Sequence, residues 1–516
     1  MSPRLAAAFE RLSEYLGAHV LLSASALVLG VATSLPLAIA ATRSARLRWP
    51  LLALASLIQT IPSLALLALF YPLLLALSAL SLAALGVGFS ALGFLPSLLA
   101  LTLYSMLPIL RNTVAGIGGV EPAIREAADA LGMTPRQKLL QVELPLAAPV
   151  VMAGIRTAAV WTIGAATLST PVGQTSLGNY IFAGLQTENW VFVLFGCAAS
   201  AGLALAADQL LGLMEAGLRR RRRLLVLAGA VGLVAGVAFA LLPLAGLGRP
   251  AAYVVGAKNF SEQYILAELM AGRLEREGAR VARKDNLGSA VAYRALAAGE
   301  LDVYVDYSGT LWTNVLGRTD NPGRQAVLDQ LTAELARRDD VRVLGSLGFE
   351  NAYAFVMRPD RARELGVASI ADLARQAPGL RLGSDLEFLS RPEWKAVETA
   401  YGLKFRSATA YQPTFMYRAL AGGEADVISA FSSDGRIAAD RLVVLTDPKA
   451  AIPPYDAVVL VSPRRRDDAR LLAALQPLIG KLPVEAMRAA NYSVDRDGGK
   501  ASPAEAARKL QTDLGL

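Results

Sequence analysis

The stretch from Arg219 to Leu247 reads RRRRRLLVLAGAVGLVAGVAFALLPLAGL and divides the chain in two. Five arginines are followed by 24 uncharged residues, Leu224 to Leu247. At ~1.5 Å per residue, a helix of this length spans a hydrocarbon core about 30 Å thick. Because arginine clusters stay on the cytoplasmic side, the helix is predicted to run outward and leave the residues after Leu247 outside the membrane. A cleaved signal peptide has the same polarity, but it lies at an N-terminus.

The charge distribution supports the same division. Residues 1–250 carry 16 Lys and Arg against 9 Asp and Glu, whereas residues 251–516 carry 35 against 34. Most of the net charge of +8 therefore lies in the membrane half, where it orients the spans and indicates no nucleic-acid partner. The single cysteine, Cys197, excludes disulfides within the chain, and one histidine, His19, leaves little material for a metal site. We expect no metal and no cofactor.

Apolar segments predict membrane spans at residues 18–41, 51–71, 95–112, 149–170, 190–214 and 224–247. The basic regions around Arg43 and Arg125 should both be cytoplasmic, so an even number of spans separates them. The second and third spans supply that number. Residues 73–93 are then predicted to be a re-entrant or outer-face excursion, although whether they cross stays open. Pro62 and Pro108 are assigned to helix packing.

A specific motif lies in the loop predicted over residues 118–148. It consists of Glu126-Ala127-Ala128, then Gly132 after three residues, then Leu144-Pro145. Small residues let a short helix seat deeply in a cleft, and Gly132 permits a sharp turn after it. The pattern resembles the cytoplasmic EAA loop of ABC-importer permeases, which docks on a separate ATPase subunit. The resemblance implies an α-helical permease of the ABC type I importer fold over residues 1–215, with ATPase coupling by these six residues.

After Gly248-Arg249-Pro250 the pattern changes to alternating strands and helices. Strands are predicted at Tyr253–Gly256, Asp302–Val305, Tyr353–Met357, Arg381–Gly383 and Ala457–Val461, and helices at Glu262–Glu277 and Ala290–Ala298. This order predicts an α/β domain with a mostly parallel sheet over residues 251–516. Residues 219–247 form an additional transmembrane helix that tethers it.

An internal repeat indicates two lobes. The segment Tyr293–Val303, YRALAAGELDV, recurs as Tyr417–Val427, YRALAGGEADV. Each copy predicts a helix, a Gly-Glu turn and a strand that ends in a polar loop. Because ligands bind at the carboxyl ends of such strands, a cleft is expected between the two lobes.

Four segments of this half carry a family resemblance: Lys258–Gln263 (KNFSEQ), Asp306–Thr310 (DYSGT), Glu387–Pro392 (EFLSRP) and Phe431–Gly435 (FSSDG). They resemble the substrate-binding proteins of osmoprotectant ABC importers, which take up glycine betaine, choline, carnitine and similar quaternary amines. The whole chain looks like a fused permease and binding protein of that group, over residues 18–215 and 253–515. A branch with the same fusion resembles importers of ergothioneine. The resemblance implies a two-lobed binding-protein fold of type II.

The resemblance also implies the ligand site. A trimethylammonium group cannot donate hydrogen bonds, so aromatic faces recognise it, at ~0.5–2 kcal/mol per ring. The family's aromatic cage maps onto Tyr307, Tyr353, Phe431 and Tyr455, and Phe431 departs from the usual tyrosine. The donors for a carboxylate map onto Lys258, Thr310 and Arg391, which argues for a carboxylated betaine over choline.

The remaining aromatic and charged residues near this site are given structural roles. We assign Tyr304, Trp312 and Tyr411 to packing, and Arg464–Arg466 to a solvated turn. The acids Asp302 and Asp306 lack a nucleophile or metal partner, which disfavours an enzyme.

The leading hypothesis is a transport subunit that captures and translocates a betaine-type solute. A membrane-anchored receptor is the alternative of another class, but no predicted cytoplasmic stretch is long enough for a signalling domain. The expected partners are a separate ATPase subunit, since the chain has no G-x-x-x-x-G-K-[ST] motif, and a second copy of this chain. We expect a multi-pass cell-membrane protein whose residues 251–516 lie on the outer face.

Overall fold

The structure is a computed structural model that describes residues 5, 8, 9, 11–86, 89, 91–186, 189–246, 253–318, 320–385, 387–411, 413–496 and 498–516. The predicted connector Gly248-Arg249-Pro250 and part of the segment 73–93 lie outside these residues. The chain divides into two compact units, one of Met1–Phe182 with Val191–Pro250, and one of Ala183–Trp190 with Ala251–Leu516.

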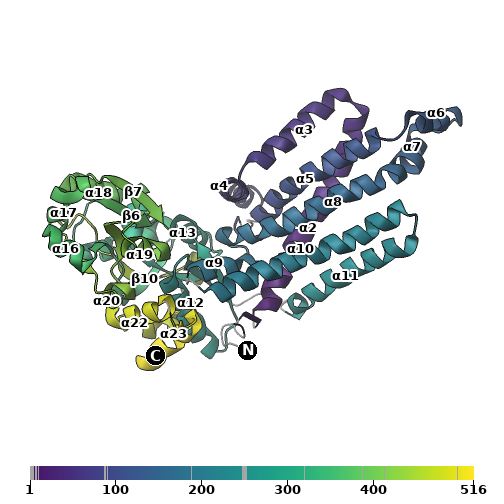
Figure 1. Cartoon of the computed structure of the whole chain (residues 1–516). Helices are drawn as coiled ribbons and strands as arrows, with labels where there is room; N and C mark the ends of the chain where they lie inside the picture. Colours follow the sequence, from purple (N-terminus) through teal and green to yellow (C-terminus); the bar gives the residue numbers. More distant parts are fainter. Residues whose placement is uncertain are drawn as a thin grey trace. The chain divides into compact units, whose positions relative to one another are not determined.

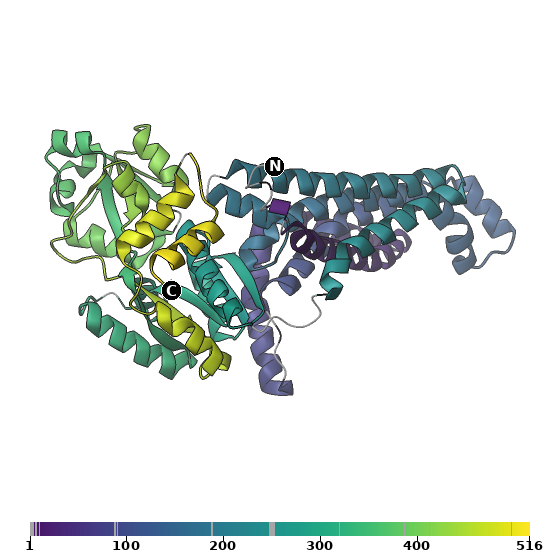
Figure 2. The same cartoon turned by 90° about the horizontal axis from the view of Figure 1, so that it is seen from below.

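The first unit is built of helices. Their bounds are α2 Leu12–Arg43, α3 Ala45–Thr60, α4 Ser63–Leu85, α5 Phe94–Gly118, α6 Pro122–Ala130, α7 Pro135–Lys138, α8 Leu144–Ala166, α9 Gly178–Gln186, α10 Trp190–Arg219 and α11 Arg223–Gly246. A π-helical turn, η1 Leu139–Glu143, precedes α8, and a 3-10 turn, η2 Thr167–Val172, follows it. The long helices α2, α5, α8, α10 and α11 run side by side (Figures 1 and 2).

Within the described residues, six helical segments are long and apolar enough to cross a membrane: Leu12–Arg43, Ser63–Leu85, Phe94–Gly118, Pro135–Val172, Trp190–Arg219 and Arg223–Leu242. All six overlap a predicted span, five of them over most of its length. The second predicted span, at 51–71, is wrong in its boundaries, because α3 ends at Thr60 and α4 runs from Ser63 to Leu85. Helix α4 thus includes residues 73–85 of the segment that was predicted to be a re-entrant or outer-face excursion.

Pro62 explains this break. Its preceding residue, Ile61, has an extended backbone, as expected before a proline, and Pro62 begins the next helix as its N-cap. The Ile61 carbonyl, which the break leaves without a helical partner, accepts a hydrogen bond from the Tyr104 hydroxyl of α5. The assignment of Pro62 to packing is therefore corrected to a helix break, whereas Pro108 lies inside α5.

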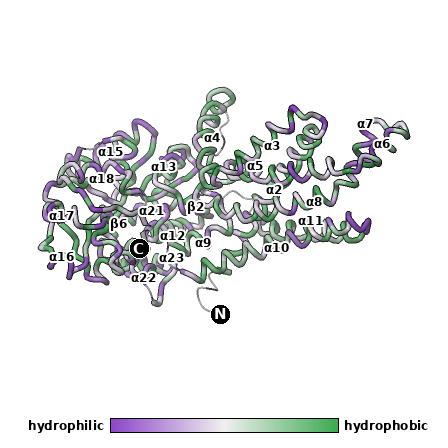
Figure 3. Tube along the Cα trace, turned by 45° about the horizontal axis from the view of Figure 1, so that its top comes forward, coloured by the Kyte–Doolittle hydropathy of each residue, from purple (hydrophilic) through white to green (hydrophobic). Residues whose placement is uncertain are grey.

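The basic segments of this unit gather at one end of the helices. The short helices α6 and α7 lie at the same end as the turn between α10 and α11, which holds Arg219–Arg223, and hydrophilic residues mark both places (Figures 1 and 3). Arg43, at the end of α2, forms an ion pair with the buried Glu143 of η1. This arrangement agrees with the prediction that these basic regions face one side of a membrane.

An ion-pair cluster joins α8 to α10 within the apolar helices. The guanidinium of Arg156 donates to both carboxylate oxygens of Asp208, at 3.0 and 2.9 Å, and to Glu215 at 2.6 Å. Bidentate pairing of this kind satisfies charges that lipid would otherwise leave unsolvated.

The second unit holds two five-stranded sheets. The first sheet has the order β2-β1-β3-β10-β4 and the second the order β7-β6-β8-β5-β9. The strands are β1 Tyr253–Lys258, β2 Val281–Leu287, β3 Val303–Tyr307, β4 Arg342–Glu350, β5 Tyr353–Met357, β6 Arg381–Asp385, β7 Ser407–Tyr411, β8 Val427–Phe431, β9 Val443–Val444 and β10 Asp456–Val461. We call the first sheet with its helices lobe 1 and the second lobe 2.

Helices cover both sheets and supply the buried apolar core. They are α12 Ser261–Arg276, α13 Ser289–Ala297, α14 Ser308–Thr310, α15 Arg324–Asp339, α16 Pro359–Leu365, α17 Ile370–Gln376, α18 Pro392–Tyr401, α19 Pro413–Ala421, α20 Gly435–Ala439, α21 Ala469–Leu475, α22 Val484–Asp495 and α23 Pro503–Asp513. Single-turn helices η3 to η7 lie at Leu311–Val315, Ala377–Gly379, Phe388–Ser390, Pro463–Arg465 and Gln476–Leu478.

The prediction of a mostly parallel sheet is correct for four of the five strands of each sheet, but it missed one reversed strand in each and the division into two sheets. In each lobe three neighbouring strands are parallel, and the other two pair antiparallel. The reason is that the chain crosses from lobe 1 to lobe 2 between β4 and β5 and returns between β9 and β10. The strand that follows each crossing, β5 in lobe 2 and β10 in lobe 1, runs against the other four strands of its sheet.

The internal repeat is confirmed in three dimensions. Helix α13 and strand β3 flank Gly299, helix α19 and strand β8 flank Gly423, and both glycines have φ of +73°. The aspartates of the two copies also match. Asp302 accepts the backbone N–H of Val254 at 2.7 Å, and Asp426 accepts that of Arg381 at 2.9 Å.

Candidate ligand-binding site

The seven residues predicted for the ligand site line one cavity between the lobes, with a volume of about 70 Å³. Strand ends position most of them: Lys258 ends β1, Tyr307 ends β3, Thr310 ends α14, Tyr353 begins β5, Phe431 ends β8, Tyr455 precedes β10 and Arg391 precedes α18. The structure therefore brings all seven predicted side chains together. The cavity also has lining residues that the sequence prediction missed: Asn259, Phe260, Ser289, Asn351, Asp385 and Glu387.

The aromatic rings form a continuous wall. Tyr353 contacts the rings of Phe431 and Tyr455, with centroids 5.2 and 5.8 Å apart. Phe260 stacks against Phe431 at 6.2 Å and against Tyr307 at 6.1 Å, so it links the rings of the two lobes. Phe260 lies in the motif KNFSEQ, Lys258–Gln263, and its position there could have predicted its place in the site.

Both cationic side chains of the cavity already have acidic partners. The Lys258 ammonium donates to the buried Asp306 at 2.7 Å and lies 4.6 Å from the centroid of the Tyr307 ring. Such pairing neutralises most of the Lys258 charge inside the protein.

Arg391 bridges the lobes. Its Nη1 donates to Glu387 at 3.0 Å and its Nη2 donates to the Thr310 hydroxyl of lobe 1 at 3.0 Å. Its Nε lies 3.4 Å from Glu393, which also accepts the Tyr455 hydroxyl. Because Thr310 accepts from Arg391, its own hydroxyl proton can point to a ligand.

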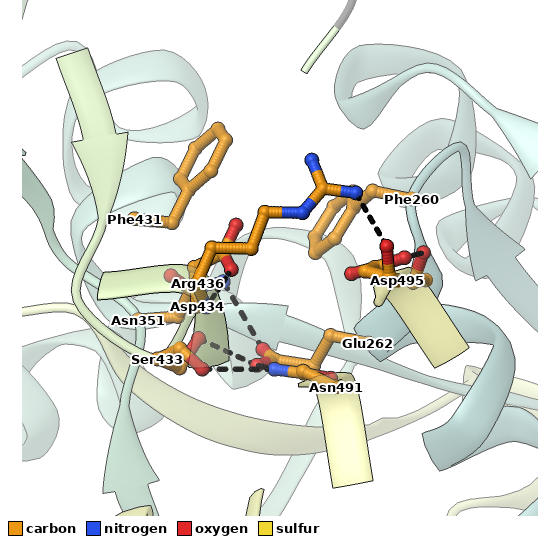
Figure 4. Close-up of a pocket in the computed structure, with 10 residues that line it drawn as sticks. Phe260, Glu262, Asn351, Phe431, Ser433, Asp434, Arg436, Asn491 and Asp495 are labelled. Carbon is orange, nitrogen blue, oxygen red and sulfur yellow. Dashed lines mark hydrogen bonds between the residues drawn. The ribbon is translucent and has the colours of Figure 1, made fainter. Parts of the chain in front are cut away.

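A buried glutamate, Glu262, connects both lobes behind this wall (Figure 4). It accepts four hydrogen bonds, from the Tyr307 hydroxyl at 2.5 Å, Asn351 at 3.1 Å, Ser433 at 2.6 Å and Asn491 at 2.8 Å. Burial raises the pKa of Glu262 while these donors lower it. The hydroxyl of Tyr307 is thus held from behind, and its ring faces the cavity.

A second small cavity, of about 40 Å³, lies beside Glu262 and shares Phe260, Asn351 and Phe431 with the first (Figure 4). Asp495 of α22 lines it and accepts a hydrogen bond from Ser261 at 2.5 Å. Burial raises the pKa of Asp495 to about 7.

Asp385 and Glu387 give the first cavity an acidic side. Asp385 is 5% exposed, and its Oδ1 accepts the backbone N–H groups of Glu387 at 2.7 Å and Phe388 at 3.0 Å. Burial raises the pKa of Asp385 above its ordinary value, and the two N–H groups oppose this shift. Among the described residues, no group of three His, Cys, Asp or Glu side chains could hold a metal ion.

Asp302 and Asp306, the two acids considered for an enzymatic role, each pair with basic side chains of the fold. Asp306 is held by Lys258, and Asp302 is buried and accepts hydrogen bonds from Arg464 and Arg465 at 2.8 and 3.2 Å. Arg464 is exposed, as expected for a solvated turn, but the assignment missed that Arg464 and Arg465 both pair with the buried Asp302. Tyr304 and Trp312 are buried, as the packing assignment requires, and Tyr411 packs against the core of lobe 2.

The residues of the predicted coupling loop lie on short helices of the first unit. Glu126, Ala127 and the buried Ala128 belong to α6, Gly132 follows it with φ of +72°, and Leu144-Pro145 begin α8. No atom lies within 4 Å of where a Gly132 Cβ would stand, so the positive φ alone favours glycine there.

Glu143 fixes the base of this loop. It is 1% exposed and pairs with Arg43 of α2 and with Arg125 of α6, whose Nε lies 3.6 Å away. On α6 and just after it, the apolar side chains of Ile124 and Leu131 are exposed. The loop therefore presents an apolar surface on a helix that is anchored from within.

Comparison with known proteins bears on both units. Residues 251–511 match the family described as the substrate binding domain of ABC-type glycine betaine transport systems. Residues 32–220 match the inner membrane component of binding-protein-dependent transport systems.

Relatives resemble the whole chain and its first half. The ergothioneine transport permease/ergothioneine binding protein EgtU of Helicobacter pylori (strain G27) is 29% identical over 90% of this chain and 84% of its own. The choline transport system permease protein OpuBB of Bacillus subtilis (strain 168) is 39% identical over 40% of this chain and 90% of its own.

A solved structure, titled as a glycine betaine/carnitine/choline ABC transporter, is 28% identical, covers 51% of this chain and 98% of its own, and has a TM-score of 0.45. The match to the binding-domain family extends over just over half of the chain. The chain thus belongs to the family of substrate-binding domains of ABC-type glycine betaine transport systems, fused here to a permease in one subunit of a betaine-, choline- or carnitine-type importer.

Proposed function

We propose that the cavity between the lobes binds the quaternary ammonium group of a betaine-type solute. The ring faces of Tyr307, Tyr353, Phe431 and Tyr455 contact the methyl groups, at ~0.5–2 kcal/mol per ring. The observation that carries this proposal is that these four rings, from both lobes, line one small cavity. A ligand that touches both lobes stabilises the closed cleft by its differential affinity for that state.

A carboxylate on the solute is proposed to meet Arg391 and Thr310. The guanidinium keeps a fixed orientation through Glu387, and the Thr310 proton is directed by the bond that Arg391 donates to its oxygen. Lys258 contributes less directly, because its ammonium is held by Asp306. We propose that it positions the Tyr307 ring beneath it.

We further propose that the chain works as a homodimer with a separate ATPase. Glu126, Ala127, Ala128, Gly132, Leu144 and Pro145 are proposed to couple the ATPase to the permease; the exposed Ile124 and Leu131 support a docking surface there. We propose that residues 1–215 form the permease domain, that residues 219–247 form the tethering helix, and that residues 251–516 form the binding domain. We propose that the binding domain lies on the outer face of the membrane. The basic segments at one end of the helices support that orientation.

Titration of the full chain in nanodiscs against glycine betaine, carnitine, choline and ergothioneine tests the ligand assignment. Tyr307→Ala should weaken every quaternary amine that binds, since all of them present methyl groups to its ring. Arg391→Ala should weaken the carboxylated ligands much more than choline. Equal losses for choline and glycine betaine in Arg391→Ala would exclude the carboxylate role, and no binding by any of the four would exclude the ligand class.

Ergothioneine, itself a trimethylammonium betaine, is the second candidate ligand. The observation that favours it is the similarity to the Helicobacter pylori relative, which extends over 90% of this chain and so includes the fusion of permease and binding domain. The same titration ranks it against the osmoprotectants.

A further inference from the structure

Among the residues that the structure describes, none supplies a hydrogen-bond partner for one oxygen of Asp385. Its Oδ1 accepts two backbone N–H groups, whereas its Oδ2 is buried and has no hydrogen-bond partner within the described part of the chain. The side chain is 5% exposed and lines the ligand cavity at the end of β6. The loop that begins at this residue therefore fixes one oxygen of the carboxylate and leaves the other oxygen of a cavity-lining side chain without a donor from the described residues.

The other charged groups that line the cavity differ in this respect. Lys258 pairs with Asp306, Arg391 pairs with Glu387 and Glu393, and Glu387 also accepts the Ser289 hydroxyl at 3.3 Å. A buried carboxylate oxygen without a donor is costly, and native structures usually satisfy such an atom by a ligand or by water. A trimethylammonium group has no hydrogen to donate. A ligand that satisfies this oxygen must therefore do so through another of its groups.

We propose that Asp385 accepts a hydrogen bond from an O–H or N–H group of the ligand, so that the cleft prefers quaternary amines that carry such a donor. The inference rests on the proposed function and narrows it. Glycine betaine has no O–H or N–H group at neutral pH and would leave Oδ2 unpaired. A hydroxylated betaine, or one with a ring N–H, would satisfy it.

A matched pair of ligands isolates this contact. Carnitine and 4-trimethylammoniobutanoate differ only in one hydroxyl group, and ergothioneine offers ring N–H groups. With the full chain in nanodiscs, calorimetric titration should show carnitine or ergothioneine binding about tenfold or more tightly than the butanoate. Asp385→Asn keeps an oxygen for the two backbone N–H groups and places a donor where Oδ2 stood. The variant should remove the preference and leave the affinity for the butanoate within about twofold.

Glu387→Gln is the control for charge. It removes one negative charge from the same side of the cavity, so it should change the affinities of donor-bearing and donor-free ligands by a common factor. An unfolding temperature close to the wild-type value confirms that Asp385→Asn is folded. If Asp385→Asn weakens carnitine alone, Asp385 accepts a hydrogen bond from an O–H group; if it weakens ergothioneine alone, Asp385 accepts one from an N–H group.

Two results would overturn the inference while leaving the proposed function intact. One is binding of all these compounds by the wild-type chain without preference for a donor. The other is an equal change for both members of the matched pair, and for ergothioneine, in Asp385→Asn. Failure of every trimethylammonium compound to bind would instead overturn the proposed function, and this inference with it.

Discussion

Replacing Glu262 tests whether one buried carboxylate holds both the cleft and the Tyr307 ring. Glu262→Ala removes the acceptor of four hydrogen bonds. Of the donors, the Asn491 amide also donates to the Ser433 carbonyl at 3.0 Å, so three donors lose their acceptor. At about 1–3 kcal/mol for each buried donor, and with water able to enter the adjacent cavity, we expect a loss of about 3–5 kcal/mol in the free energy of unfolding.

Glu262→Gln should behave very differently. The isosteric amide keeps one oxygen as an acceptor. Its NH₂ group can donate to Asn351 after the Asn351 amide rotates by 180°, since the Oδ1 of Asn351 has no partner in the described parts of the chain. The amide is also uncharged, so the variant removes the cost of burying a charged carboxylate, which is the cost that raises the pKa of Glu262. We therefore expect a loss below about 1–2 kcal/mol.

Two measurements on the full chain in nanodiscs decide the matter: thermal unfolding, and titration with whichever betaine binds. Because Ser433 belongs to lobe 2 and Tyr307 lines the cavity, Glu262→Ala should weaken ligand binding as well as stability. Glu398→Ala, at an exposed glutamate of α18, is the control and should change neither quantity. Equal effects of the alanine and glutamine variants, or wild-type behaviour of both, would refute the role given to the carboxylate.

Three further predictions concern other parts of the chain. Gly132→Val should strongly reduce ATP-driven uptake, because valine tolerates φ of +72° poorly, and it should leave ligand affinity unchanged. The control is Gly118→Ala in α5, where a Cβ also meets no atom within 4 Å, and it should keep uptake normal. Asp495 has a folded-state pKa of about 7 against an ordinary 3.8, so the folded state binds the extra proton and stability should fall as the pH rises from about 4 to 7. Unfolding temperatures measured over that range should show a shallower fall in Asp495→Asn; an unchanged slope would contradict the assignment. Arg156→Met should cost about 3–5 kcal/mol by leaving two acids unpaired between helices, and neutralising both acids in the same chain should restore the unfolding temperature.

The sequence by itself determined the division of the chain, the helical character of its first half and the family of its second half. These features depend on local properties. Five arginines followed by 24 uncharged residues predict a membrane span regardless of the rest of the chain. Short motifs such as KNFSEQ are recognised from adjacent residues alone. The same is true of the repeat, in which Gly299 and Gly423 take the same backbone conformation.

Tertiary structure decided three features: the helix boundary at Pro62, the strand directions in the two sheets, and which acidic residues pair with the cations of the ligand cavity. Hydropathy is an average over a window, so it does not detect a break whose freed carbonyl is satisfied by Tyr104 from another helix. Strand direction in each sheet depends on where the chain crosses between lobes, which composition does not encode. The sequence predicts Lys258 and Arg391 as cations, but only the fold pairs Lys258 with Asp306 and Arg391 with Glu387. It also leaves one oxygen of Asp385 without a partner among the residues described. Lys258 and Asp306 are 48 residues apart and meet because β1 and β3 are neighbours in the sheet of lobe 1. Glu387 and Arg391 are only four residues apart and flank the single turn η5.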